Sequence, residues 1–397
     1  RHYDIIVGYN SYSFDMPYIG ERGKLLKASY SPMARYARHG HIDLMRRIIG
    51  TFGRLTGVRS YKLDDVAKMF IGEEKIKFEG KVIDLFHNDK KTLKEYNLRD
   101  CWLVKKIDEK MGISELMIAM CEWTGSFPSL FRQTSAISGI SVSALLDTYI
   151  LRTAKNTDIH YPTARWETST EKYEGGLVLD AIPGRYNDVY IFDFKSLYPS
   201  IIWSWKISPE NVCYDPNTTE PLTISAQPGV FFYKNRVAIF PHLVDSLIEA
   251  RKTYRKMMRE QSPDSMEYKK FNVMQQIAKE LTNSLYGQIG QQGNRYYNKN
   301  VAGSVTGAGR TLLRKVKEIC EGLGFKVIYG DTDSGFVTGL NITPKELLKI
   351  VNDTLKVFLK EKFNIDESIV ELDYEKKIKR FIQVGGKNYA GLLEELE

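Results

Sequence analysis

The stretch YGDTDS at positions 329–334 restricts the fold of this chain more than any other part of its sequence. Apolar runs at positions 325–328 and 335–338 flank it, and two such runs joined by a tight polar turn predict a β-hairpin. Residues two apart on an extended strand share a face, so we expect Asp331 and Asp333 to point the same way. Carboxylates that close repel each other unless a cation lies between them, and their hard oxygen atoms suit Mg²⁺. A solvated loop tip has the same composition, so the interpretation as a metal site requires a third carboxylate.

Asp193 supplies that third carboxylate. It ends the β-prone run VYIFD at positions 189–193, and the residues SLYP that follow predict a short helix with Pro199 near its first turn. One carboxylate on a strand beside two on a hairpin form the set that a two-metal phosphoryl-transfer site requires. The stretches DFKSLYPSII and YGDTDS together resemble motifs A and C of family B (alpha-type) DNA polymerases. Their spacing is too short for the insertions of the protein-primed branch, which favours a nucleic-acid primer.

The resemblance implies catalytic roles for the three aspartates and a pair of Mg²⁺ ions. Asp193 and Asp333 would ligate both ions, with Asp331 beside them as a weaker or indirect ligand. The primer 3′-hydroxyl would attack the α-phosphate of a deoxynucleoside triphosphate in line. The ring of Tyr198 would lie beneath the incoming sugar and clash with a ribose 2′-hydroxyl, although packing in a buried turn is an alternative. The nucleotide-binding residues implied around motif A are Ser196, Leu197 and Tyr198.

Two long helical patterns joined by QSPDS (261–265) predict an antiparallel helix pair. A basic stripe on such a helix is usually solvated. The second helix, however, carries the pattern K-x-x-x-N-S-x-Y-G, which resembles motif B of the same family. That resemblance implies that Lys279, Asn283 and, on the first helix, Arg251 bind the triphosphate, with Lys279 also acting in catalysis. Tyr286 and Gly287 would form the floor beneath the nascent base pair.

The first hundred residues carry a second set of acidic residues. Asp15 follows an apolar strand and a polar turn, and Tyr96 and Asp100 share one face of a helical pattern. Each is an ordinary feature alone, but together they resemble the Exo II and Exo III motifs of a 3′–5′ proofreading domain. The resemblance implies that Asp15 and Asp100 ligate two further Mg²⁺ ions while Tyr96 orients the attacking water. The family's first exonuclease motif is absent, so proofreading requires upstream residues, and we interpret 41–44 as a structural strand.

Two further segments resemble DNA-binding motifs of the family. Tyr173, Gly175 and Gly176 match its Y-x-G-G sequence, which contacts the template, although a plain turn before a strand would have the same composition. Lys387 and Tyr389 match its K-x-Y sequence, which holds the primer terminus. We therefore expect primer-template DNA to contact all five residues, together with Gly287 of motif B.

Composition agrees with a polyanionic partner without proving one. The chain has 57 Lys and Arg against 49 Asp and Glu, a net charge of +8. Residues 374–381 alternate basic and apolar side chains and predict an edge strand facing a phosphate backbone. The four cysteines form no C-x-x-C pair, and no apolar run approaches the ~20 residues that span a bilayer. We expect an intracellular protein, in cytoplasm, nucleoid or nucleus, with no membrane association.

The expected fold class is α+β. A right-hand polymerase palm, built from an antiparallel sheet with helices and carrying two-helix fingers, would follow an incomplete RNase H-like α/β exonuclease domain. The expected domains are exonuclease (1–115), helical connection (116–170), first palm part (171–240), fingers (241–292), second palm part (293–386) and the start of a thumb (387–397).

Seven motifs in the family's order predict a template-directed DNA polymerase from a longer protein. The alternative is a catalytically silent scaffold that binds DNA within a replication complex, but such a protein would be expected to lose metal ligands. An exonuclease alone would not explain the palm motifs. Expected partners are primer-template DNA, deoxynucleoside triphosphates and a sliding clamp or other replisome proteins.

Overall fold

The computed structural model describes residues 5–27, 40–48, 60–78, 80–126, 142–163, 173–263 and 265–393. The chain divides into two compact units. Residues Arg1–Tyr149 and Tyr254–Ile277 form the first, and Ile150–Thr253 and Ala278–Glu397 form the second. Among the helices within the described ranges, none combines the length and apolarity that crossing a bilayer requires.

The first unit has a two-stranded parallel sheet, in which β1 (Ile5–Gly8) pairs with β2 (Gly40–Asp43). This confirms the strand predicted around 41–44. Its structural role is confirmed as well, because the Asp43 carboxylate accepts hydrogen bonds from the backbone N–H groups of Asn10 (2.9 Å) and Tyr12 (3.0 Å). The helices of this unit are α1 (Asp15–Leu25), α2 (Leu44–Arg47), α3 (Leu63–Ile71), α4 (Val82–Asn88), α5 (Lys90–Met111), α6 (Ile113–Thr124) and most of α7 (Val142–Ala154).

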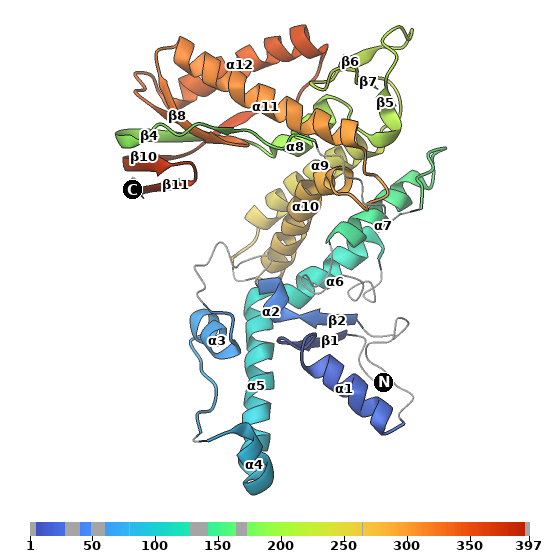
Figure 1. Ribbon diagram of the computed structural model, residues 1–397, viewed down its shortest axis with the longest axis vertical. Coiled ribbons are helices and arrows are strands. Elements are labelled where there is room, and N and C mark those ends of the chain that lie inside the picture. The colour runs from blue at the N-terminus through green and yellow to red at the C-terminus, as the bar shows by residue number, and fades with distance from the viewer. Residues whose placement is uncertain are drawn as a thin grey trace. The chain divides into compact units, whose positions relative to one another are not determined.

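The second unit is built on a six-stranded sheet in the order β11-β10-β4-β9-β8-β3 (Figure 1). Neighbouring strands are antiparallel throughout. The strands are β3 (Val178–Leu179), β4 (Gly184–Phe194), β8 (Lys326–Asp331), β9 (Ser334–Thr338), β10 (Leu372–Gly385) and β11 (Asn388–Leu393). The pairing of β8 with β9 confirms the predicted hairpin. The prediction of an edge strand at 374–381 is wrong, because β11 covers that edge of β10; residues 388–393, expected to begin a thumb, form this edge strand.

Helices of the second unit pack on this sheet and beside it. They are α8 (Leu197–Ser204), α9 (Ile239–Arg259), α10 (Met266–Gly290), α11 (Lys299–Gly322) and α12 (Pro344–Phe363), with a 3₁₀ turn at Pro209–Asn211. A small sheet pairs β7 (Phe231–Tyr233) with both β5 (Val212–Cys213) and β6 (Leu222–Ile224). The ends of α9 and α10 nearest their connection belong to the first unit. There the rings of Tyr254 and Phe271 stack, with 6.4 Å between centroids.

Local sequence explains where α12 begins and which face it buries. Thr343 and Glu346 form a capping box, in which each side chain accepts from the other's backbone N–H. Leu347, Val351 and Leu355 recur at helical spacing and are buried. The sequence therefore accounts for both the start of α12 and its buried face.

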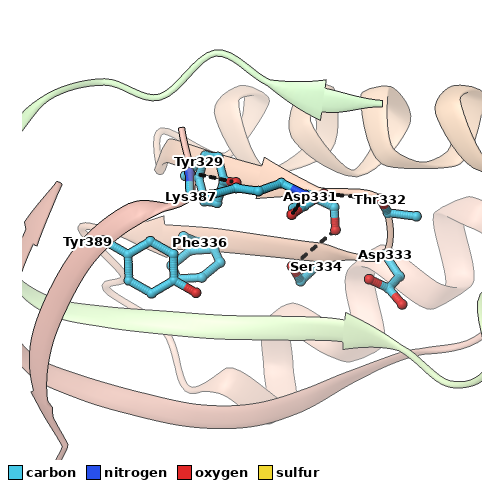
Figure 2. A pocket seen from close by; sticks show the side chains of 8 residues that line it. All are labelled: Tyr329, Asp331, Thr332, Asp333, Ser334, Phe336, Lys387 and Tyr389. Atoms are coloured by element: carbon cyan, nitrogen blue, oxygen red, sulfur yellow. Dashed lines mark hydrogen bonds and ion pairs between the residues drawn. The ribbon is translucent and has the colours of Figure 1, made fainter. Parts of the chain in front are cut away.

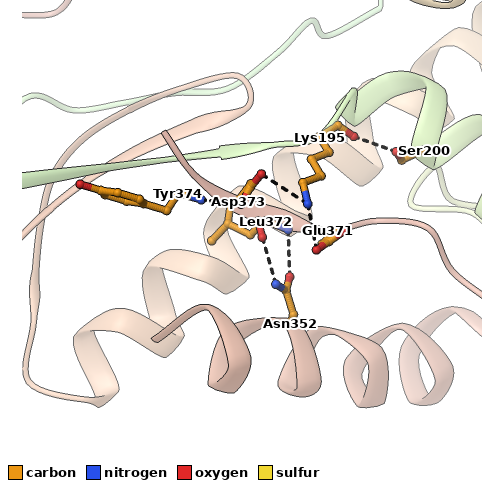
Figure 3. Close-up of polar contacts among 7 residues, drawn as sticks. All are labelled: Lys195, Ser200, Asn352, Glu371, Leu372, Asp373 and Tyr374. Carbon is orange, nitrogen blue, oxygen red and sulfur yellow. Dashed lines mark hydrogen bonds and ion pairs between the residues drawn. The ribbon is translucent and has the colours of Figure 1, made fainter. Parts of the chain in front are cut away.

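Asn352 fastens α12 to the start of β10 (Figure 3). Its amide nitrogen donates to the Leu372 carbonyl at 3.0 Å, and its amide oxygen accepts from the Leu372 N–H at 2.8 Å. The side chain thus acts as a strand partner for a buried residue. The register of β10 against β4 places Leu372 opposite Phe194 and Asp373 opposite Asp193. A helix side chain therefore helps to fix the strand beside Asp193.

Replacing Asn352 by alanine should destabilise the second unit. The change leaves the Leu372 N–H and C=O without partners in a buried position, which should cost about 2–3 kcal/mol of unfolding free energy. Asp353→Ala, at the neighbouring exposed position of α12, is the matched control and should cost less than about 0.5 kcal/mol. Chemical denaturation measures both values; equal costs would contradict the role given to Asn352.

Candidate active site

The tip of the β8–β9 hairpin is a tight turn with a left-handed residue. Asp331 ends β8, Thr332 has φ of +59°, and the Asp333 N–H donates to the Asp331 carbonyl at 2.7 Å. Because the chain reverses at Thr332, the two carboxylates do not follow the alternation of an extended strand. Figure 2 shows them pointing apart, so the expectation that both face the same way is wrong.

The Asp331 carboxylate pairs with Lys387. The Nζ atom of Lys387 lies 3.0 Å from Asp331 Oδ2, and the Thr332 hydroxyl lies 3.1 Å from Oδ1. Lys387 occupies the turn between β10 and β11 with φ of +59°, and its N–H donates to the Tyr329 hydroxyl at 3.2 Å. Hydrogen bonding to Asp331, aided by its charge, raises the pKa of Lys387. The structure therefore brings together a predicted DNA-binding residue and a predicted catalytic one.

Asp193 and Asp333 form the electrostatic centre of the site. The Phe194 N–H donates to the Asp333 carbonyl at 2.9 Å, and Asp193 lies opposite Ser334 in the β4–β9 register. Burial, followed by the charges of Asp333 and Glu375, raises the pKa of Asp193 to about 7. Burial is also the largest cause that raises the pKa of Asp333. Half-buried carboxylates of like charge gain from a nearby cation, so this donor set fits a hard divalent metal ion.

A complete metal-ligand cluster is not formed, however. Within the described residues, no group of three or more His, Cys, Asp or Glu side chains is placed to hold a metal ion. Asp331, the expected third member, is paired with Lys387 instead. Asp193 and Asp333 are thus the pair that fits a cation directly, and Asp331 is separate from them.

A pocket of about 430 Å³ lies against the hairpin (Figure 2). Its aromatic wall includes Tyr389, whose ring centroid lies 5.3 Å from that of Phe336 and 6.0 Å from that of Tyr329. Its polar wall comprises Lys387 and the hairpin residues 331–334. Both residues of the K-x-Y motif therefore line the same pocket as Asp331 and Asp333.

Sequence reasoning missed the acidic residues that β10 places beside motif A. Lys195 lies 3.0 Å from Glu371 and 3.3 Å from Asp373 (Figure 3). Glu375 contributes to the raised pKa values of both Asp193 and Asp333. These residues reach the site through long-range strand pairing, and no local spacing in the sequence signals them.

The three motif A residues predicted to bind nucleotide are placed differently from one another. Ser196 adopts the left-handed conformation (φ +48°) just before α8, and the Leu197 side chain is buried. The Leu197 side chain therefore belongs to the core. Tyr198 is half-buried, with its ring centroid 4.6 Å from that of Tyr286 on α10, and burial raises its pKa.

The predicted motif B residues lie on one side of α10. Lys279, Asn283 and Gly287 are exposed, whereas Leu281 and Leu285 are buried. Their spacing of four residues along the helix explains why these three residues share its exposed face. Arg251 on α9 is half-buried.

The Y-x-G-G segment contacts motifs A, B and C. The Tyr173 hydroxyl lies 2.8 Å from the Tyr286 hydroxyl and donates to the Gly290 carbonyl at 3.0 Å. A methyl group on Gly176 would lie 3.1 Å from the Tyr198 hydroxyl and 3.0 Å from Thr332 Oγ1. Gly175 has open space around its Cα. The segment is therefore a packed part of the site and not a free turn.

The predicted exonuclease residues lie in the first unit. Lys75, which sequence reasoning missed, donates to the Tyr96 hydroxyl at 2.9 Å and pairs with Asp100 at 2.7 Å. Burial opposes a charged Lys75, but the hydrogen bonds that Lys75 donates to Asp100 and Tyr96 outweigh burial and raise its pKa. The other oxygen of Asp100, Oδ1, is buried and has no hydrogen-bond partner among the described residues, which suits a cation ligand. Asp15 is exposed at the start of α1.

Comparison with known proteins shows similarity to two families over different parts of the chain. The family model described as DNA polymerase family B matches residues 135–397, and that of the RNase H superfamily matches residues 1–112. The DNA polymerase of Archaeoglobus fulgidus is 30% identical over 404 residues, which cover 99% of this chain and 48% of the relative. The DNA polymerase delta catalytic subunit of Schizosaccharomyces pombe is 27% identical, with 98% and 39% covered.

A solved structure is similar as well. The family B DNA polymerase from the hyperthermophilic archaeon Pyrobaculum calidifontis matches with a TM-score of 0.67 and 28% identity, covering 98% of this chain and 51% of that one. The chain thus spans about half the length of the relatives that it matches.

The raised pKa of Asp193 predicts how stability depends on pH in cation-free buffer. Between its ordinary pKa of 3.8 and about 7, the folded state holds a proton that the unfolded chain has lost, so stability falls as pH rises through this window. Asp193→Asn removes the charge. It should therefore raise the melting temperature at pH 8, by a margin that shrinks towards pH 5.

Thermal unfolding in EDTA at several pH values measures this margin. Asp245→Asn, at an exposed position of α9, is the control and should show no such trend. A margin for Asp193→Asn that does not change with pH would contradict the burial of its charge.

Proposed function

The chain belongs to DNA polymerase family B, and from that membership we propose that it carries the nucleotidyl-transfer centre of a template-directed DNA polymerase. One observation carries the proposal: the β4–β9 pairing holds two half-buried carboxylates, Asp193 and Asp333, in one site. Among the described side chains, no Lys or Arg forms an ion pair with either of them. Residues with the chemistry to bind a triphosphate and a primer-template surround this pair.

Asp193 and Asp333 would hold two Mg²⁺ ions, and Asp331 would contribute as a weaker or indirect ligand. When bound, such ions acidify the primer 3′-hydroxyl and neutralise charge on the phosphates and on the leaving pyrophosphate. The chain itself would supply the rigid frame, because the pairing of β4 with β9 and of β8 with β9 would hold these side chains in place before any substrate arrives.

Residues on the fingers helices would bind the nucleotide. The exposed cation of Lys279 and the amide of Asn283 lie along α10, and Arg251 adds a second cation from α9. Positive groups facing the β- and γ-phosphates stabilise the charge that develops on the leaving group. The sugar and base would rest on motif A and the end of motif B, which contribute Ser196, Leu197, Tyr198, Tyr286 and Gly287.

Two segments would hold the DNA. Tyr173, Gly175 and Gly176 would contact the template, and Lys387 and Tyr389 would contact the primer end beside the catalytic pair. The relative from S. pombe is named as a catalytic subunit, which supports a complex with further subunits as the setting of the full-length protein. A sliding clamp or other replisome proteins would be its partners there.

Primer extension tests the polymerase. With Mg²⁺ and four deoxynucleotides, the full-length protein should extend a primer as the template directs, and Asp333→Asn should slow extension by roughly 10³-fold or more because a ligand charge is lost. Asp245→Asn should retain the full rate. Duplex binding without any extension by the unaltered protein would instead support a silent scaffold.

We also propose that the first unit contributes to 3′–5′ proofreading in the full-length protein. Its similarity to the RNase H superfamily supports this second activity, and so does the buried Asp100 Oδ1, which has no hydrogen-bond partner within the described part of the chain. Asp15 and Asp100 would ligate metal, Tyr96 would orient the attacking water, and Lys75 would hold Tyr96 and Asp100 in place.

Asp100→Asn in the full-length protein separates the two activities. Removal of a mispaired primer terminus should slow by roughly 10²-fold or more, since a metal ligand loses its charge, while extension of a matched primer stays unchanged. Asp108→Asn on the same helix is the control. Unchanged removal of the mispair by Asp100→Asn would rule out this assignment.

A further inference from the structure

Two side chains of helix α11 donate hydrogen bonds to the backbone of the Y-x-G-G segment. The Thr306 hydroxyl donates to the Glu174 carbonyl at 2.7 Å. One guanidinium nitrogen of Arg310 donates to the same carbonyl at 2.8 Å and to the Gly175 carbonyl at 2.6 Å. Thr306 and Arg310 are one helical turn apart, so both face the segment. Two successive carbonyl groups are therefore fixed in direction.

The donors of these hydrogen bonds are buried, whereas residues 174–176 are exposed. Thr306 is 1% exposed and the Arg310 side chain 12% exposed, and Arg310 also pairs with the Glu174 carboxylate at 3.1 Å. A buried donor that loses its acceptor is left unsatisfied, which is costly. The bonds from α11 therefore restrain an exposed segment from shifting relative to this helix.

On its other side, the Y-x-G-G segment lies against the Tyr198 hydroxyl and the β8–β9 hairpin. We call residues 176 and 177 the wall. A methyl group on Gly176 would meet the Tyr198 hydroxyl at 3.1 Å and Thr332 Oγ1 at 3.0 Å. The Leu177 carbonyl accepts from the Thr332 N–H at 2.8 Å. The backbone of this segment thus separates, and spaces, the motif A tyrosine and the catalytic hairpin.

Helix α11 also limits the Tyr198 ring directly. A methyl group on Gly309 would lie 3.3 Å from Tyr198 Cε1, and the Tyr286 ring packs 4.6 Å away between centroids. Tyr198 is therefore enclosed by two glycines and an aromatic ring. Its position is set by its neighbours, and a small movement of the wall would give it room to recede.

We propose that Thr306 and Arg310 are positioning residues for sugar selection. By holding residues 173–177 against α11, they keep the wall behind Tyr198 in place, so that the ring cannot retreat from a ribose 2′-hydroxyl. The inference rests on the proposed role of Tyr198 in the polymerase site. It assigns specificity to two side chains that need not touch the nucleotide.

A matched pair of variants at Thr306 tests the inference. Thr306→Val keeps the shape of the side chain but loses the hydroxyl, and Thr306→Ser keeps the hydroxyl. In the full-length protein, the ratio of kcat/KM for ribonucleotides to that for deoxynucleotides should rise on the order of fivefold in Thr306→Val and stay near the unaltered value in Thr306→Ser. Because Thr306 is buried, direct contact with DNA would not explain such a difference.

Tyr198→Ala provides the reference for the same ratio. It should increase ribonucleotide use, and adding Thr306→Val to it should cause no further increase, because both changes act through one ring. If Tyr198→Ala raises the ratio while Thr306→Val does not, the inference is overturned and the polymerase proposal stands. If extension proceeds but Tyr198→Ala leaves the ratio unchanged, Tyr198 is not the selecting residue, and the inference falls with it.

A purely structural role predicts another pattern. Thr306→Val would then lower the efficiency for both nucleotide types equally, which would also overturn the inference. Gly176→Ala offers a second route if Thr306→Val folds poorly, since its methyl group enters the same wall from the opposite side at about 3 Å. It should change the ratio as well, and an unchanged ratio in a folded, active Gly176→Ala protein would contradict the wall.

Discussion

The burial of two neighbouring acidic side chains, Asp193 and Asp333, is the constraint on which the site of the second unit depends. Both carboxylates are half-buried, and burial is the largest cause that raises each pKa, with the charge of Asp333 adding to it at Asp193. A strong backbone frame is needed to hold them there. The frame is the antiparallel pairing of β4 with β9, including the hydrogen bond from the Phe194 N–H to the Asp333 carbonyl. On the other side of β4, Asn352 fixes the start of β10.

Local features of this frame could be predicted from the sequence. The hairpin follows from two β-prone runs around a polar turn, and the start of α12 follows from Thr343 and Glu346 at capping-box spacing. Such features depend on residues a few positions apart, where composition and periodicity carry the information. The exposed face of Lys279 and Asn283 on α10 is predictable for the same reason.

Other features depend on contacts that no local pattern records. Thr332 adopts a left-handed conformation that threonine rarely takes, and this single residue turns Asp331 away from Asp333. The pairing of β11 with β10 changed an expected edge strand into an inner one. Lys75 reaches Tyr96 and Asp100 from a separate segment, so only the fold connects them.

The ion pair between Lys387 and Asp331 has a thermodynamic consequence. The ammonium group offsets part of the negative charge of Asp331, so this carboxylate attracts a cation less strongly while Lys387 is paired with it. In the proposed polymerase site, a DNA phosphate that drew Lys387 towards itself would restore that attraction. By reciprocity, a cation at Asp331 would strengthen the hold of Lys387 on the phosphate by the same factor. A single side chain would thus link the arrival of the primer to the filling of the metal site.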